Sequence, residues 1–268
     1  LRPMASRTPW RETGGGTVLI GGDYQGKNPA IQNAFRTYVA PDATIIADAI
    51  SSGDGGKVVI WSDDATRAYG TISARGGALS GDGGLVETSG KGYLDVNGLR
   101  VNTGAAFGAA GTWLLDPSEI TVIHGSAGAL SGGIFDPGGP SSIGDSQING
   151  GLLGGNVILQ TTNGSNGSGD ITFQGDTVFI SNASGLARTL TLNADHDIVL
   201  RGTLATTSGR LDVNLNATNA VSTPGGATLI LDGGTGGLKA YVNNGKVWSN
   251  AGTVTLQRKS ENLEISPE

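Results

Sequence analysis

The sequence places a histidine between two carboxylates, at Asp195, His196 and Asp197. Polysaccharide hydrolases use paired carboxylates to protonate a leaving group and to activate water, in some cases with a histidine nearby. If this segment is extended, Asp195 and Asp197 lie on one side of the strand and His196 lies on the other. Because aspartate is a common turn former, we interpret the triplet as a polar turn before a strand at residues 198–200.

A second set of acidic residues lies in the first half of the chain. Asp63 and Asp64 are adjacent, and Glu87 and Asp95 are the residues that a stacked fold would bring near them. A row of carboxylates is a ligand set for Ca²⁺, but the sequence lacks the Gly-Gly-x-Gly-x-Asp repeat that binds calcium in other β-rolls. We therefore expect these acidic side chains to be solvated. His124, which stands alone in the sequence, is expected in a loop. We predict no metal, no cofactor and no catalytic residue.

Two kinds of residue point to carbohydrate. Trp61 and Trp113 fall within strand-like segments, and an outward aromatic ring there would stack on a sugar. They are the candidate glycan contacts, although so large an apolar side chain is more often in the core. Asn-x-Ser/Thr sequons, candidate N-glycosylation sites, start at four positions: Asn163, Asn166, Asn182 and Asn216. A chain so rich in Asn, Ser and Thr contains several sequons by chance.

The elements that position these residues follow from the composition. Glycine supplies 47 of the 268 residues, far above its usual share of about 7%. Gly, Ser, Asn, Asp and Thr all rank low in helix propensity, which excludes a helix bundle. The glycines have no three-residue period, which excludes collagen. The remaining class is an all-β protein with many short strands and tight turns.

Charge and cysteine content exclude further classes. The net charge is −6, and the Lys and Arg residues are scattered singly, so we expect no nucleic-acid partner. No apolar run approaches the roughly 18 residues of a membrane span, so none is predicted. The absence of cysteine excludes disulfides, thiol catalysis and Cys-ligated zinc.

A local pattern of small residues followed by a short apolar strand recurs along the chain. Gly56, Gly84 and Gly111 open successive copies at steps of 28 and 27 residues. Such a period is typical of a solenoid, in which each repeat buries its apolar face only by stacking on its neighbours. The pattern predicts a right-handed parallel β-helix with short strands and excursion loops, with glycines at positive φ in the corners. A β-sandwich is the alternative, but the Asn-Gly pairs do not separate matched strands.

The repeats divide the chain into blocks. We predict a first β-helix block at 14–123 and a second at 151–257, separated by a Gly/Ser/Pro-rich excursion at 124–150. Residues 1–13 form a tail or cap, and 258–268 form a second tail. Within the first block, 24–41 lacks strand alternation and is expected to be a loop. Loops on a rigid scaffold tend to carry recognition residues, so 24–41 and 124–150 are candidate binding surfaces.

Several segments resemble the filamentous-haemagglutinin-type exoproteins of bacterial two-partner secretion systems. In the first half they are 15–27 (Gly-Gly-Thr-Val-Leu-Ile-Gly-Gly-Asp-Tyr-Gln-Gly-Lys), 58–64 (Val-Val-Ile-Trp-Ser-Asp-Asp), 69–77, 81–91 and 111–122 (Gly-Thr-Trp-Leu-Leu-Asp-Pro-Ser-Glu-Ile-Thr-Val). The stretch 190–200 is similar to the later repeats of that family. The resemblance covers about residues 14–257. The Asn-Pro-Asn-Gly type of motif of the family's secretion domain is absent from the sequence, so the likeness is to the passenger shaft.

The resemblance implies a function outside the cell. It implies a right-handed parallel β-helix exported through an outer-membrane pore to the surface of a Gram-negative bacterium. There the chain is expected to act as a non-enzymatic adhesin or structural rod that presents a surface to carbohydrate, matrix or host cells. Two alternatives remain: an enzyme that degrades polysaccharides on a β-helix scaffold, and a pure spacer in a longer exoprotein. The enzyme requires two carboxylates about 5–9.5 Å apart in one cleft.

Overall fold

The computed structural model shows a β-rich chain made mostly of parallel strands, with one α-helix among the described residues. The described residues are 14–126, 140–162, 167–175, 177–201, 204–208 and 211–222, with the strand segments 229–231, 238–243, 246–248, 256–258 and 263–267. The predicted tail at 1–13 lies outside them. The β-rich class is therefore confirmed, whereas the block boundaries stay predictions.

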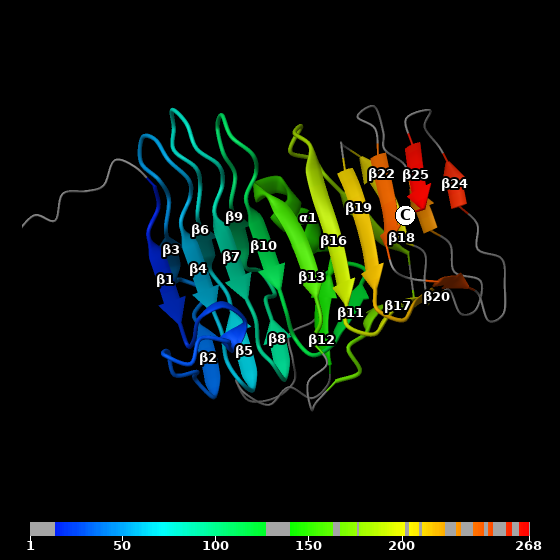
Figure 1. Cartoon of the computed structure of the whole chain (residues 1–268), viewed down its shortest axis with the longest axis horizontal. Helices are drawn as coiled ribbons and strands as arrows, with labels where there is room; N and C mark the ends of the chain where they lie inside the picture. The colour runs from blue at the N-terminus through cyan, green and yellow to red at the C-terminus, as the bar shows by residue number, and fades with distance from the viewer. Residues whose placement is uncertain are drawn as a thin grey trace, which may run out of the picture.

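One long sheet takes every third strand that the structure describes, in the order β1-β4-β7-β10-β13-β16-β19-β22-β25. Its strands are β1 (Thr17–Ile20), β4 (Lys57–Ile60), β7 (Leu85–Thr88), β10 (Thr112–Leu115), β13 (Asn156–Gln160), β16 (Arg188–Ala194), β19 (Leu211–Ala217), β22 (Leu238–Asn243) and β25 (Leu263–Pro267). Figure 1 shows them side by side, in chain order from blue to red. The last strand lies within 258–268, where the sequence had suggested a tail.

Four smaller sheets take the remaining strands, again with every pairing parallel. One is β12-β11-β14-β17-β20-β23: β12 (Ser141–Gly144), β11 (Ile120–Ile123), β14 (Ile171–Phe173), β17 (Asp197–Leu200), β20 (Ala220–Ser222) and β23 (Lys246–Trp248). Another is β15 (Val178–Ser181), β18 (Leu204–Ser208), β21 (Leu229–Leu231) and β24 (Leu256–Arg258). The last two are β2 (Arg36–Val39), β5 (Ala65–Ala68) and β8 (Tyr93–Asp95), and β3 (Thr44–Ile46), β6 (Thr71–Ser73) and β9 (Arg100–Asn102).

The core is built from columns of apolar side chains that run across the long sheet. One column passes through Val58, Val86, Trp113, Val157 and Leu190, which are register partners on successive strands. All five side chains are buried. Since neighbouring residues of a strand point to opposite faces, this column defines the inner face, and the residues between its members define the outer face.

Glycine is required at the start of these strands because the backbones of neighbouring strands approach each other closely there. A Cβ on Gly84 would lie 2.0 Å from the carbonyl oxygen of Gly56, and one on Gly111 would lie 2.1 Å from that of Gly84. Positive φ, which the repeat pattern predicts for glycines at corners, is not found at Gly84 or Gly111. It is found at other corners, such as Gly70 and Gly98, where φ is 84° and 81°.

The predicted excursion at 124–150 is only partly described. Residues 127–139 lie outside the described residues, but β12 and helix α1 (Asp145–Gly154) follow at once. The helix crosses the predicted boundary at residue 150. It buries Ile148 and Leu152 in the core. Likewise, the predicted loop at 24–41 contains a one-turn 3-10 helix, η1 (Tyr24–Gly26), and strand β2.

Candidate functional site

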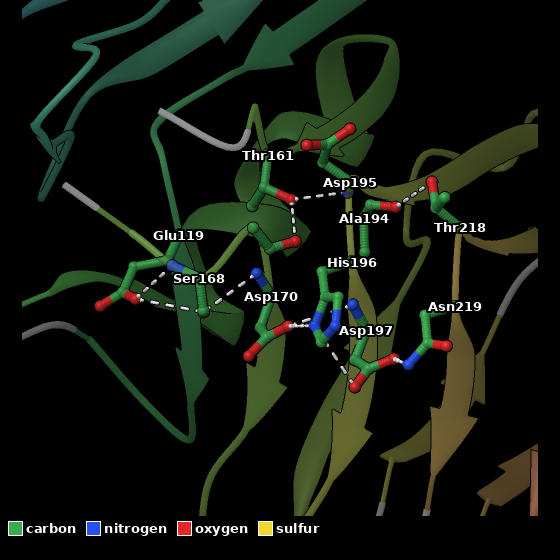
Figure 2. A network of polar contacts seen from close by, with 11 residues as sticks. Glu119, Thr161, Ser168, Asp170, Ala194, Asp195, His196, Asp197, Thr218 and Asn219 are labelled. Carbon is green, nitrogen blue, oxygen red and sulfur yellow. Dashed lines mark hydrogen bonds and ion pairs between the residues drawn. The ribbon is translucent and has the colours of Figure 1, made fainter. Parts of the chain in front are cut away.

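The Asp195–His196–Asp197 triplet meets a fourth residue that sequence reasoning did not connect with it. Figure 2 shows His196 between Asp170, from the preceding coil of chain, and Asp197. His196 Nδ1 lies 2.8 Å from Asp170 Oδ1 and 3.4 Å from Asp197 Oδ2. The Asp195 carboxylate points away from this contact. The predicted turn is present at 195–196. Because the chain bends here, the alternation that would hold for an extended segment does not apply.

Asp170, His196 and Asp197 form one compact polar cluster. Their ligand atoms all lie within 4.8 Å of one another, and they are the one metal-capable group found among the described residues. Asp170 Oδ1 also accepts the backbone N–H of Asp197 at 3.1 Å, and Asn219 Nδ2 donates to Asp197 Oδ1 at 2.9 Å. The hydrogen bond with Asp170 raises the pKa of His196 above its usual 6.5. The cluster therefore connects the starts of two neighbouring strands, β14 and β17, and it contains an ion pair when His196 is protonated.

A second, buried site gathers around Glu87. Glu87 lies on the outer face of the long sheet, yet its side chain is 0% exposed because the segment around η1 covers it. The backbone N–H of Gln25 donates to Glu87 Oε1 at 3.0 Å, and Gln25 Nε2 donates to Asp116 Oδ2 at 3.0 Å. Lys27 Nζ donates in turn to Gln25 Oε1 at 2.7 Å. Gln25 is the one non-glycine residue with positive φ among the described residues, at 53°.

Burial dominates the electrostatics of this site. It raises the pKa of Glu87 to about 7, with the Gln25 N–H acting in the opposite direction. Burial also raises the pKa of Asp116, against hydrogen bonds from Thr162, Gln160 and Gln25. Each carboxylate is occupied by donors from its own chain. Glu87 and Asp116 therefore hold the η1 segment on the sheet.

The candidate glycan contacts Trp61 and Trp113 are both buried. Trp61 is 6% exposed, and a Cβ on Gly26 would lie 2.5 Å from its ring, so the η1 segment packs directly on it. Trp113 is 1% exposed, points into the core and donates from Nε1 to Thr88 Oγ1 at 2.9 Å. Trp61 borders a pocket of about 350 Å³, but little of either side chain is exposed for a sugar to stack on.

The other predicted acidic residues are dispersed. Asp63 Oδ1 accepts from Asn33 Nδ2 at 3.0 Å, and Asp64 pairs with Arg36 at 2.6 Å. Asp95 lies in β8, where its Oδ2 accepts from the Tyr69 hydroxyl at 2.8 Å. His124, expected in a loop, contacts Asp145 at the start of α1, with 2.8 Å between Nδ1 and Oδ2.

Two of the four predicted sequons are described. Asn163 and Asn166 lie outside the described residues. Asn182 is 1% exposed, and its Nδ2 donates to the carbonyl oxygen of Leu186 at 2.6 Å. Asn216 is half-buried and donates to Asn193 Oδ1 at 2.8 Å. In the folded chain both described amide nitrogens are held by internal hydrogen bonds.

Sequence reasoning missed a polar groove on the outer face of β13, β16 and β19. It has a volume of about 490 Å³. Its lining is dominated by amide and hydroxyl side chains, among them Gln160, Thr162, Asn193 and Asn216, with Lys27 from the η1 segment. The available signal was the alternation of polar with apolar residues in 188–194 and 211–217, which marks a polar outer face.

Comparison with known proteins adds no family. A scan against protein-family models gives no match, and a search of the curated proteins finds no relative. Among the described residues, no helix combines the length and the apolar character needed to cross a membrane.

Proposed function

We propose that this chain is a segment of a right-handed parallel β-helix that acts as a non-enzymatic rod outside the cell. In this proposal the rod presents a binding surface to carbohydrate, matrix or host cells, as an adhesin does. The parent protein would reach the surface of a Gram-negative bacterium through an outer-membrane pore. The motifs at 15–27 and 111–122, which resemble haemagglutinin-type exoproteins, support export and location.

The observation that carries the proposal is the unbroken order of the long sheet. From β1 to β25 every third strand joins the same sheet in parallel, so each turn of chain repeats the placement of the one before. A stack of this kind has a continuous core and repeated outer faces. Such geometry suits a scaffold that holds a surface at a distance and repeats one set of contacts along its length.

The carboxylates favour a rod over a hydrolase because they are engaged in contacts within the chain, including Glu87 and Asp116, which Gln25 joins. Asp64 is paired with Arg36, and Glu87 is buried beneath Gln25. The Asp170 and Asp197 side chains share His196 as a partner. A glycosidase needs one carboxylic acid and one carboxylate directed at the same scissile bond. The polar groove favours a binding rod over a pure spacer, because a spacer needs no shaped surface.

Beads coated with the purified chain test the proposal against both alternatives. The beads are washed over layers of epithelial cells and over polysaccharide-coated plates, with albumin-coated beads as the control. The chain is also incubated with soluble polysaccharides, and released reducing ends are counted. We expect retention on at least one surface without release of reducing ends. Release of reducing ends would identify a hydrolase. Bead retention no better than that of the albumin-coated beads would indicate a spacer. Either result contradicts the proposal.

A further inference from the structure

We infer that the polar groove over β13, β16 and β19 is a binding site for an extended, neutral polysaccharide lying across the strands. This inference rests on the proposed function, since it names the ligand class and the residues of a binding surface on the same rod. Gln160, Asn193 and Asn216 are the residues assigned to contact it, with Thr162 beside them. Trp61 and Trp113, which the sequence offers as candidate glycan contacts although so large a side chain is more often in the core, are buried.

The three amides occupy one column of the outer face. Gln160 pairs with Asn193 in the register of β13 and β16, and Asn193 pairs with Asn216 in that of β16 and β19. The register continues to Asn243 on β22. Neighbouring strands of a sheet are about 4.8 Å apart. The column therefore repeats the same polar group at a constant step along the stack, which suits a ligand that repeats its own polar groups.

The amides are held in place before any ligand arrives. Asn216 Nδ2 donates to Asn193 Oδ1 at 2.8 Å, and Gln160 Nε2 donates to Asp116 Oδ2 at 3.0 Å. Thr162 Oγ1 donates to Asp116 Oδ1 at 2.9 Å. Ordering rotamer-rich side chains on binding costs conformational entropy, and this cost is reduced when the side chains are already fixed.

Fixed amides still retain hydrogen-bonding capacity. A primary amide carries two N–H donors and an oxygen with two lone pairs, and each of these contacts engages one N–H of its donor amide. Gln160 and Asn193 can thus offer a donor and an acceptor side by side, whereas Asn216 Oδ1 is buried, so Asn216 offers its second N–H alone. Adjacent hydroxyls of a sugar ring, each both donor and acceptor, match that arrangement. The groove volume of about 490 Å³ also falls within the roughly 300–1,000 Å³ usual for ligand sites.

The charges in the groove favour a neutral chain over an anionic one. Among the lining residues that the structure describes, Lys27 is the one cation and Asp195 the one carboxylate. The Lys27 ammonium already donates to Gln25 Oε1. Recognition of sulfate or phosphate groups along a polymer relies on clustered Arg and Lys side chains. With a single lysine, the groove gives a repeating polyanion no advantage over an uncharged glycan.

Affinity electrophoresis tests the site with defined probes. The intact chain is run through native gels that contain mixed-linkage β-glucan, galactomannan or dextran sulfate. We expect at least one neutral polysaccharide to retard the chain, and dextran sulfate to retard it less. The double variant N193A/N216A should weaken retardation at least tenfold. The matched control is N214A, which removes an asparagine on the same strand and face but outside the groove lining. Its retardation by the polysaccharide should stay within twofold of that of the parent chain.

A second readout does not depend on how well the variants fold. In the ¹⁵N-labelled intact chain, the side-chain amide signals of Gln160, Asn193 and Asn216 should shift on addition of β-glucan oligosaccharide, whereas that of Asn214 should not. The inference is overturned if the amide signals of the groove residues do not change. It is also overturned if N214A loses as much retardation as N193A/N216A, or if dextran sulfate retards the chain more than the neutral polysaccharides do. If bead retention persists in any of these cases, the rod's adhesive function survives and only this site is wrong. If retention also fails, both proposals fall.

Discussion

At the scale of single residues, the η1 segment is held over the sheet by a carboxylate that folding removes from water. Burial raises the pKa of Glu87 from 4.5 to about 7. A carboxyl group whose pKa is higher in the folded state stabilises the fold while it is protonated in that state. That contribution is complete below about pH 4.5 and is lost as the pH rises through about 7. Glu87 therefore makes the folded chain less stable at pH 8 than at pH 5.

Replacing Glu87 with glutamine should remove this pH dependence. E87Q keeps an acceptor for the Gln25 N–H but carries no charge to desolvate. At pH 8 it should raise the free energy of unfolding by up to roughly 3 kcal/mol, the value of a shift of about 2.5 pKa units. Urea unfolding at pH 5 and pH 8 measures the effect, and E119Q is the matched control. Equal urea midpoints for E87Q and the parent chain at pH 8 would contradict the burial argument.

His196 is expected to titrate above the usual range. Its hydrogen bond with Asp170 raises its pKa above 6.5, with smaller effects from nearby carboxylates. The raised pKa means that the imidazolium form stabilises the fold below pH 6.5, and that this contribution disappears as the pH rises through the folded-state pKa.

The ring signals of His196 followed by NMR measure this titration directly. D170N should lower the midpoint toward 6.5, because it removes the carboxylate that holds the proton in place. D212N, which lies on another strand, should leave the midpoint where it is. A midpoint at or below 6.5 in the intact chain would show that the Asp170–His196 contact does not form in solution.

Residue-level chemistry was only partly predictable from the sequence. The turn at 195–196 followed from the residue types, because aspartates beside a short apolar strand favour a corner. The partner Asp170 lies 26 positions earlier, and no local pattern connects the two residues. The same holds for Gln25, which is 62 positions from Glu87. Contacts between coils depend on the register of the whole stack.

At the scale of elements, helix α1 is fitted closely against the core. A Cβ on Gly151 would lie 2.6 Å from the Trp113 ring and 2.8 Å from a Val157 methyl group. G151A should therefore destabilise the chain by roughly 1–3 kcal/mol through overpacking. At the adjacent Gly150 an added Cβ would meet nothing within 4 Å, so G150A should stabilise by up to about 1 kcal/mol through helix propensity.

Thermal or urea unfolding of the two alanine variants checks whether their stability changes have opposite signs. Both variants make the same chemical change on one helix, one residue apart, so propensity alone would shift them equally. If G151A were as stable as G150A, the close packing of α1 on Trp113 would be wrong.

The elements themselves were predicted unevenly. The strands followed from small residues at a regular step, because crowding between coils allows only glycine at positions such as Gly84. The helix was missed, since its sequence contains three glycines and lacks a strong helix signal. It forms because Ile148 and Leu152 are buried in the core. Burial of this kind is tertiary information that propensity does not contain.

At the scale of the whole molecule, the proposed rod depends on one sheet extending without interruption. The outer positions Thr17, Lys57, Leu85 and Thr112 are register partners on β1, β4, β7 and β10. Further along, Thr189 and Asp212 are register partners on β16 and β19. Composition predicted short strands and the repeat predicted that they are parallel, but the order of strands in the sheet is a property of the whole chain.

Distances between spin labels along this sheet test the stack most directly. Because the chain contains no cysteine, single labels can be placed at Thr17, Thr189 and Asp212 without removing native thiols. β16 is five strands from β1 in the sheet and β19 is six. At about 4.8 Å per strand, the 17–189 and 17–212 backbone separations should be about 24 Å and about 29 Å.

Pulsed electron paramagnetic resonance on T17C/T189C and T17C/D212C measures these two distances. The label tethers add a similar length to both, so the increment of about 5 Å is the decisive quantity. We predict two narrow distributions separated by that increment, as a rigid parallel stack requires. Equal distances, a shorter distance for 17–212, or broad overlapping distributions would contradict the continuous stack and the rod built on it.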